Sequence, residues 1–189
     1  MAKGSKNIRW TDVKAGLERY DLRRLLALVR DLYDASADNR RFVHARVLGS
    51  ETELEKYRAL ILDAVYPDLL GRKRVRIGEA QRLVRHFRQA TGDTSGTVDL
   101  MLTLVEAGTD LAADTGHGDE AYFESLEKTL AAAVEALTTL PADEQVSGGK
   151  RLASIVSRAA SIGWGYCDAV REIAASYGCR SGQRNMPAV

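Results

Sequence analysis

The sequence predicts an all-α protein, a compact multi-helix array of about eight or nine helices with no sheet. Apolar residues recur at the i, i+3, i+4, i+7 spacing of a helix through most of the chain. No alternating segment of useful strand length interrupts them. Capping residues, glycines and prolines stand between the periodic segments, where helices begin and end. At 189 residues the chain can bury a sizeable core without metal or disulfides.

Local signals predict the first two helices. Thr11 can cap a short helix, and Trp10 and Ala15 occupy the positions of a hydrophobic staple. A second helix begins near Leu22, where an apolar stripe at helical spacing faces away from charged residues. The stripe consists of Leu22, Leu25, Leu26, Val29, Leu32 and Tyr33. This second helix is therefore predicted to be amphipathic.

A third helix is expected over 38–48, ended by the glycine that follows. Ser50 and Glu53 form a capping-box pair for a fourth helix. That helix must end by Pro67, because the residue before a proline disfavours the helical conformation. Pro67 opens a basic, glycine-containing segment, residues 67–77, which we interpret as a connecting loop.

Two helices are expected between this loop and residue 115. The first ends near Gly92, and its apolar residues at helical spacing mark a buried face. These are Ala80, Leu83, Val84 and Phe87. The second covers 97–114 and is expected to be more buried, because apolar residues occupy a broad arc of its surface.

Three helices are expected in the last third of the chain. Asp119 can cap a helix over 120–139, and Pro141 suits the first turn of the helix after it. A last helix covers about residues 165–177. The residues after it lack core side chains and predict a flexible tail.

The elements group into four parts. They are an N-terminal helical part (1–66), the basic connecting loop (67–77), a C-terminal helical part (78–178) and the flexible tail (179–189). The loop is the best candidate boundary because it combines Pro, Gly and a run of basic residues. We expect the parts to form one cooperative domain.

The net charge of +1, from 27 Lys and Arg against 26 Asp and Glu, hides a division along the chain. Residues 1–90 carry +8, residues 91–150 carry −10 and residues 151–189 carry +3. The nearest partner for the basic block is the acidic block of the same protein. The charge pattern therefore excludes a uniformly charged coat and predicts that the two blocks meet.

Three carboxylates at successive i+4 positions form what we call the acidic ridge, Glu106, Asp110 and Asp114. Like charges at this spacing repel by roughly 0.2–0.5 kcal/mol per pair, so the ridge requires an offsetting cation. Its source is a basic residue of the N-terminal half, a partner protein or a divalent metal. The acidic interaction or metal candidates are Glu106, Asp110, Asp114, His117, Asp119 and Glu120. The Glu-x-x-His pairs and the HExxH motif of metalloenzymes are absent from the sequence.

Basic residues of 72–88 form a second candidate surface. They are Arg72, Lys73, Arg74, Arg76, Arg82, Arg85 and Arg88. Arginine at every third residue of a helix presents repeated cations along one edge, which can follow a phosphate backbone. No recognised nucleic-acid motif accompanies them. Nucleic-acid binding therefore stands as the alternative to a face that is paired within the protein.

Several stretches together carry a family resemblance. They are DVKAGLERYDLRRLLALVRDLY at 12–33, YRALILDAVYP at 57–67, VEAGTDLAADTGHGDEAYFESLEKTL at 105–130 and SIGWGYCDAVREI at 161–173. In combination they resemble an uncharacterised bacterial family of small all-helical proteins, a domain of unknown function. The resemblance implies a helical cytoplasmic protein and transfers no catalytic residue.

The function that these observations favour is a non-catalytic protein-interaction module with complementary acidic and basic surfaces. The acidic segment of residues 99–127, which contains the ridge, is expected to meet the basic surface of 72–88 in the same chain or in a neighbouring subunit of a homo-oligomer. Nucleic-acid binding by 72–88 is the alternative, and a metal-dependent enzyme at the ridge is the third hypothesis. No cofactor is indicated. Two cysteines, no signal-peptide pattern and no long apolar run predict a cytoplasmic protein without a membrane segment.

Overall fold

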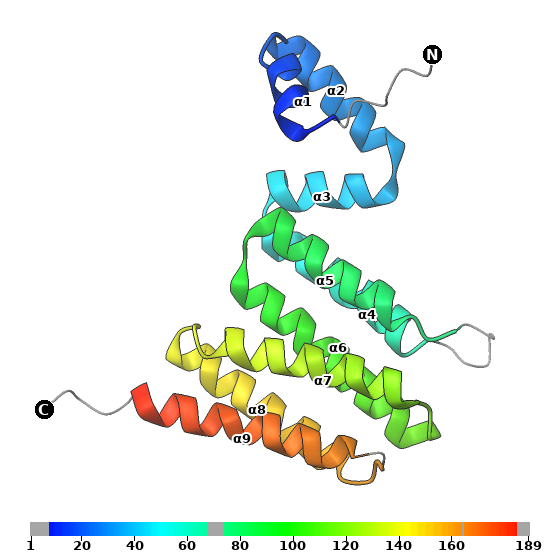
Figure 1. The fold of residues 1–189 in the computed structure, drawn as a ribbon, viewed down its shortest axis with the longest axis vertical. Helices are drawn as coiled ribbons and strands as arrows, with labels where there is room; N and C mark the ends of the chain where they lie inside the picture. The colour runs from blue at the N-terminus through cyan, green and yellow to red at the C-terminus, as the bar shows by residue number, and fades with distance from the viewer. Residues whose placement is uncertain (1–7, 68–73, 164, 185–189) are drawn as a thin grey trace, which may run out of the picture. The chain divides into compact units, whose positions relative to one another are not determined.

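The computed structural model describes residues 8–67, 74–163 and 165–184 (Figure 1). These residues form nine α-helices and no strand, which confirms the predicted all-α class. The helices are α1 (Trp10–Leu17), α2 (Leu22–Ala35), α3 (Ala37–Leu48), α4 (Ser50–Val65), α5 (Ile77–Thr91), α6 (Thr94–Thr115), α7 (Glu120–Leu137), α8 (Ala142–Ala159) and α9 (Tyr166–Arg184). None of them combines the length and the apolar character needed to cross a lipid bilayer.

The chain forms two compact units that divide between Val43 and His44. Unit 1 contains α1, α2 and the first half of α3, and unit 2 contains the remaining helices. The boundary predicted from the sequence lies at 67–77, of which 68–73 lie outside the described residues. The helices on either side, α4 and α5, pack against each other, and the rings of Tyr57 and Phe87 lie 5.3 Å apart. The segment 67–77 therefore connects two helices of one unit.

Unit 2 is built of two layers of helices. α4, α6 and α8 lie side by side in one layer, and α7 and α9 pack beside each other in the second, which also contains α5 (Figure 1). Each helix of the first layer packs on its successor in the second layer. This is the side-by-side stacking of helix pairs that α-solenoids use. Because a returning helix separates them, α4, α6 and α8 run in the same direction.

The central helix of unit 2 is α6, which packs on α4, α5, α7 and α8. Fourteen of its 22 residues are buried, as its broad apolar arc predicted. It begins at Thr94 and not at Thr97, because the Asp93 side chain accepts a hydrogen bond from the Gly96 amide and caps the helix. It ends at Gly116, whose φ of +70° is the left-handed conformation of a helix C-cap.

Most other helix ends follow their local signals, but α1 begins at Trp10 with Arg9, and not Thr11, at its N-cap. Asp119 caps α7 by accepting a hydrogen bond from the Tyr122 amide, as predicted. Gly49, and not Ser50, occupies the N-cap of α4. The last helix continues past Tyr177 to Arg184, so residues 179–184 of the expected tail are helical, while 185–189 lie outside the described residues. Gly178 does not adopt the positive φ of a C-cap glycine and therefore does not end the helix.

Candidate functional site

Four carboxylates follow one side of α6, at positions that place them in line along the helix. They are Asp99, Glu106, Asp110 and Asp114, and we call them the α6 carboxylate row. Each is paired with an arginine from a neighbouring helix of the same layer. The row contains the whole acidic ridge, and its partners decide whether the ridge is available to a ligand.

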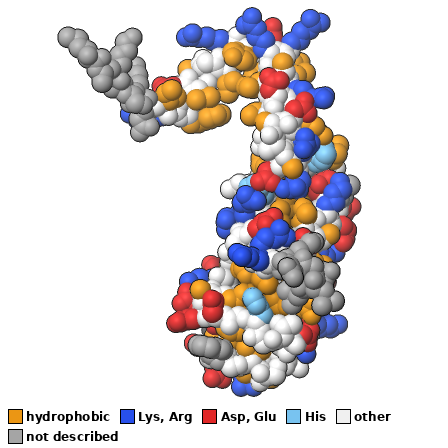
Figure 2. Space-filling view, turned by 90° about the vertical axis from the view of Figure 1, so that its right-hand side faces the viewer, with side chains coloured by type: hydrophobic (Ala, Val, Ile, Leu, Met, Phe, Trp, Pro, Cys, Tyr) orange, Lys and Arg blue, Asp and Glu red, His pale blue; other side chains and the backbone are white. Residues whose placement is uncertain are grey.

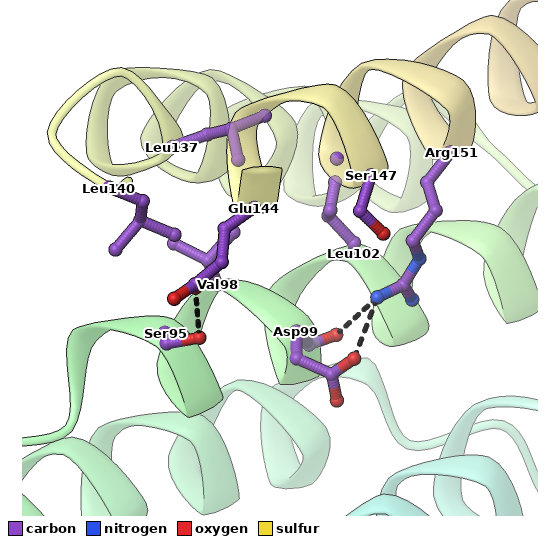
Figure 3. A pocket seen from close by; sticks show the side chains of 10 residues that line it. Ser95, Val98, Asp99, Leu102, Leu137, Leu140, Glu144, Ser147 and Arg151 are labelled. Carbon is purple, nitrogen blue, oxygen red and sulfur yellow. Dashed lines mark hydrogen bonds and ion pairs between the residues drawn. The ribbon is translucent and has the colours of Figure 1, made fainter. Parts of the chain in front are cut away.

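Arg151 of α8 pairs with the first two carboxylates of the row. Its Nε donates to Glu106 Oε1 at 2.7 Å and its Nη2 to Glu106 Oε2 at 2.6 Å, a two-pronged contact. Its Nη1 donates to Asp99 Oδ1 at 2.8 Å, and its Nη2 also reaches Thr103 Oγ1 at 3.0 Å. Figure 3 shows Arg151 directed from α8 toward Asp99. One guanidinium group thus joins two carboxylates that lie two turns apart on α6.

Asp99 is also held from the opposite side of α6. Arg58 of α4 donates from Nη2 to Asp99 Oδ2 at 2.6 Å. The Asp99 side chain is 25% exposed and receives one arginine on each carboxylate oxygen. Both of its oxygens are therefore occupied by protein groups.

Arg158, also on α8, pairs with the last two carboxylates. It donates from Nε to Asp110 Oδ1 at 3.0 Å and from Nη2 to Asp114 Oδ1. Tyr66, directly after α4, donates its hydroxyl proton to Asp114 Oδ2 at 3.0 Å. This hydrogen bond raises the pKa of Tyr66, because ionisation would place two negative oxygens together.

The ridge thus meets arginines of the same chain, and they are not those of the basic surface of 72–88, which was expected to meet it within the chain or from a neighbouring subunit. Among the described residues, the arginines that reach Glu106, Asp110 and Asp114 are Arg151 and Arg158. They belong to the third charge block, residues 151–189, which was not predicted to pair with the ridge.

The predicted basic surface lies elsewhere in unit 2. Arg76 pairs with Asp63 at 2.9 Å and with Glu79 at 3.4 Å. Arg74, Arg82, Arg85 and Arg88 are exposed, the last three along the side of α5 that faces away from its buried residues. Arg72 and Lys73 lie outside the described residues. Binding of nucleic acid by this surface stays a prediction.

The remaining candidates for an acidic interaction or a metal site lie at the turn between α6 and α7. They are His117, Asp119 and Glu120. Asp119 is engaged as the N-cap of α7, and the ring of His117 packs edge to face on Tyr122 at 5.2 Å. Glu120 occupies the first turn of α7, where a negative charge suits the helix dipole. Among the residues that the structure describes, no three His, Cys, Asp or Glu side chains are grouped closely enough to hold a metal ion.

A small hollow lies beside the carboxylate row, between α6 and α8 (Figure 3). It encloses about 150 Å³, whereas small-molecule sites commonly measure about 300–1,000 Å³. Its polar groups bind each other, since Ser95 donates to Glu144 and Arg151 to Asp99. The hollow therefore offers little volume and few uncommitted polar groups to a substrate.

Unit 1 presents a different surface. α1 and α2 bury no side chain, although α2 carries the apolar stripe that the sequence predicts. Leu22 is 71% exposed, Leu26 60% and Leu32 52%. Orange side chains gather on the visible face of this unit in the upper part of Figure 2. We define the unit 1 apolar surface by the exposed apolar side chains along one face of α2, Leu22, Leu26, Val29 and Leu32.

Sequence reasoning identified the amphipathic α2 but did not count it among the candidate sites. The signal was present in the clean separation of apolar and charged residues between Leu22 and Tyr33. Amphipathicity shows that a face must be covered, and it does not show whether the cover comes from the same chain. The structure identifies this face as exposed within unit 1.

Comparison of the chain with protein-family models, with curated proteins and with solved structures gives no match.

Proposed function

We propose that this chain is a non-catalytic protein-interaction protein that binds its partner through the unit 1 apolar surface. The main support is the exposure of Leu22, Leu26 and Leu32 on a unit whose first two helices bury no side chain. Contiguous exposed apolar side chains on a folded protein mark interaction sites. Charged residues beside the stripe, Arg23, Arg30 and Asp34, form a polar border, as is typical of interfaces.

Energetics favour this surface over the charged ones. Burying a leucine or valine side chain completely contributes about 1.5–3 kcal/mol. Because the exposed side chains of α2 are roughly half to two-thirds accessible, each retains about 1 kcal/mol that a partner can gain. An exposed ion pair contributes about 0–1 kcal/mol, and part of that is lost to salt. Apolar burial is therefore the larger source of affinity.

The carboxylate row supports a non-catalytic role. A general base or metal ligand needs a carboxylate oxygen directed at the proton or the ion. Glu106 uses both oxygens to bind Arg151, and Asp114 divides its oxygens between Arg158 and Tyr66. These groups hold helices together in the described structure.

Site-specific photo-crosslinking tests the proposal. A photoreactive amino acid is introduced at Leu26, within the apolar stripe, in cells that naturally produce the protein. The matched control places the same amino acid at Arg24, which is also exposed but lies on the edge of α2 far from the stripe. We expect a covalent adduct of discrete mass from position 26 and none from position 24. Equal labelling at the two positions, or none, would refute the proposed function.

A further inference from the structure

We propose that the unit 1 apolar surface binds a second copy of this chain, with the two α2 helices antiparallel. The inference rests on the proposed function and names the partner of that surface. It is carried by the order of charges along α2, which a second copy complements.

The charges of α2 oppose its own helix dipole. Arg23 and Arg24 occupy the first turn, and Asp31 and Asp34 lie toward the last turn. Apart from the N-cap Asp21, the helix has no acidic residue in its first turn and no basic residue in its last. A helix favours the reverse order, because its N-terminus carries partial positive charge. An antiparallel copy of α2 brings acidic residues beside the basic end and basic residues beside the acidic end.

Helical geometry identifies the pair that meets. Arg23 and Asp34 are 11 positions apart, close to three turns, so they lie on the same edge of α2, beside the apolar stripe. When two copies are antiparallel and centred between residues 28 and 29, Arg23 of each lies opposite Asp34 of the other. Arg30 already holds Asp34 on this edge, with Nε 2.7 Å from Oδ2. A two-fold axis makes the contact twice.

The alternatives fit the same charges less well. Parallel copies would place Arg23 against Arg23 and Asp34 against Asp34, which repel. A lipid surface favours helices whose polar face is rich in Lys and Arg. The polar face of α2 carries Asp31 and Asp34 beside its arginines, and these would face an anionic membrane unfavourably. A second copy satisfies both signs of charge.

Charge exchange in the full-length chain tests the pairing. The variants are Arg23→Glu and Asp34→Arg, and sedimentation equilibrium over a wide concentration range measures self-association. We expect the wild type to form a dimer and each variant alone to dimerise roughly tenfold more weakly, because two attractive contacts become repulsive. An equal mixture of the two variants, and the variant that combines both changes, should regain wild-type affinity. Far-UV circular dichroism verifies that each variant is folded.

The control is Arg24→Glu, which makes the same charge change one position away, on the edge of α2 far from the stripe. It should leave the dimer unchanged. A wild-type chain that stays monomeric overturns the proposal, as does equal weakening by Arg24→Glu or failure of the mixture to recover. A monomer that binds vesicles containing phosphatidylserine overturns it in favour of a lipid surface. The crosslinking at Leu26 separates the two proposals, because an adduct with a different protein retains the proposed function and excludes the second copy.

Discussion

Replacing Arg151 by methionine tests whether the carboxylate row stabilises unit 2. Methionine retains an unbranched apolar stem like that of arginine but has no guanidinium group. The change removes all four hydrogen bonds that Arg151 donates to the side chains of Asp99, Thr103 and Glu106. Breaking a fully buried ion pair costs about 3–5 kcal/mol, and an exposed pair contributes about 0–1 kcal/mol. Arg151, Asp99 and Glu106 are 26, 25 and 31% exposed, between these limits. Because Asp99 retains Arg58, we expect a loss of about 2 kcal/mol in the free energy of unfolding.

Urea unfolding followed by far-UV circular dichroism measures this loss. The matched variant is Arg158→Met on the same helix, which also faces two carboxylates. Its partners Asp110 and Asp114 are 50 and 42% exposed, and Arg158 itself is 44% exposed. We therefore expect this variant to lose clearly less stability than Arg151→Met. A loss below about 0.5 kcal/mol for Arg151→Met, or equal losses for both, would show that the row adds little to stability.

Two further predictions concern packing and pH. Gly148→Ala should destabilise the protein by about 1–3 kcal/mol, because a β-carbon there would lie 2.5 Å from Cδ1 of the buried Leu137. Gly149→Ala, where the nearest atom is 3.4 Å away in Tyr177, should be neutral or stabilise by up to about 1 kcal/mol, and equal melting temperatures for the two variants would contradict the packing argument. Burial raises the pKa of Tyr166 from 10.0 to about 12, so the folded state keeps a proton that the unfolded chain loses first, and stability should fall as the pH rises from 10 to 12. Urea unfolding across this range should show a smaller decline for Tyr166→Phe than for the wild type.

The parts of the fold that sequence predicted are those set by neighbours along the chain. Asp119 caps α7 through the amide three residues later, and Gly92 and Gly116 end helices with a left-handed backbone. Such signals need no knowledge of tertiary structure. The extension of α9 to Arg184 was missed because its last residues lack an apolar pattern, although nothing in them ends a helix.

The site depended on contacts that no local pattern encodes. Arg151 lies 45 positions from Glu106 and 52 from Asp99, and Arg158 lies 48 from Asp110. Repulsion along the ridge predicted that a cation must be present, and the sequence left its source open between basic residues of the N-terminal half, a partner protein and a divalent metal. The packing of α8 on α6 determines which arginine pairs with the ridge. That packing in turn depends on apolar residues.

The layer of α4, α6 and α8 explains how one row of carboxylates on α6 pairs with groups on both of its sides. On one side of α6, Arg58 contacts Asp99, and Tyr66, which comes later in the chain, contacts Asp114. The contacts therefore follow the same order along both chain segments. On the other side, Arg151 contacts Asp99 and Arg158 contacts Asp114, again in the same order. This common order means that the three helices run parallel. The returning helices α5 and α7 also pack on α6, and the ion pairs join α4 and α8 to its two sides. The spacing of like charges along the acidic ridge, which by itself suggests a bound ligand, is therefore explained by arginines within unit 2. The opposed charge order of α2, whose neighbouring apolar stripe is exposed, calls for a partner from outside the unit.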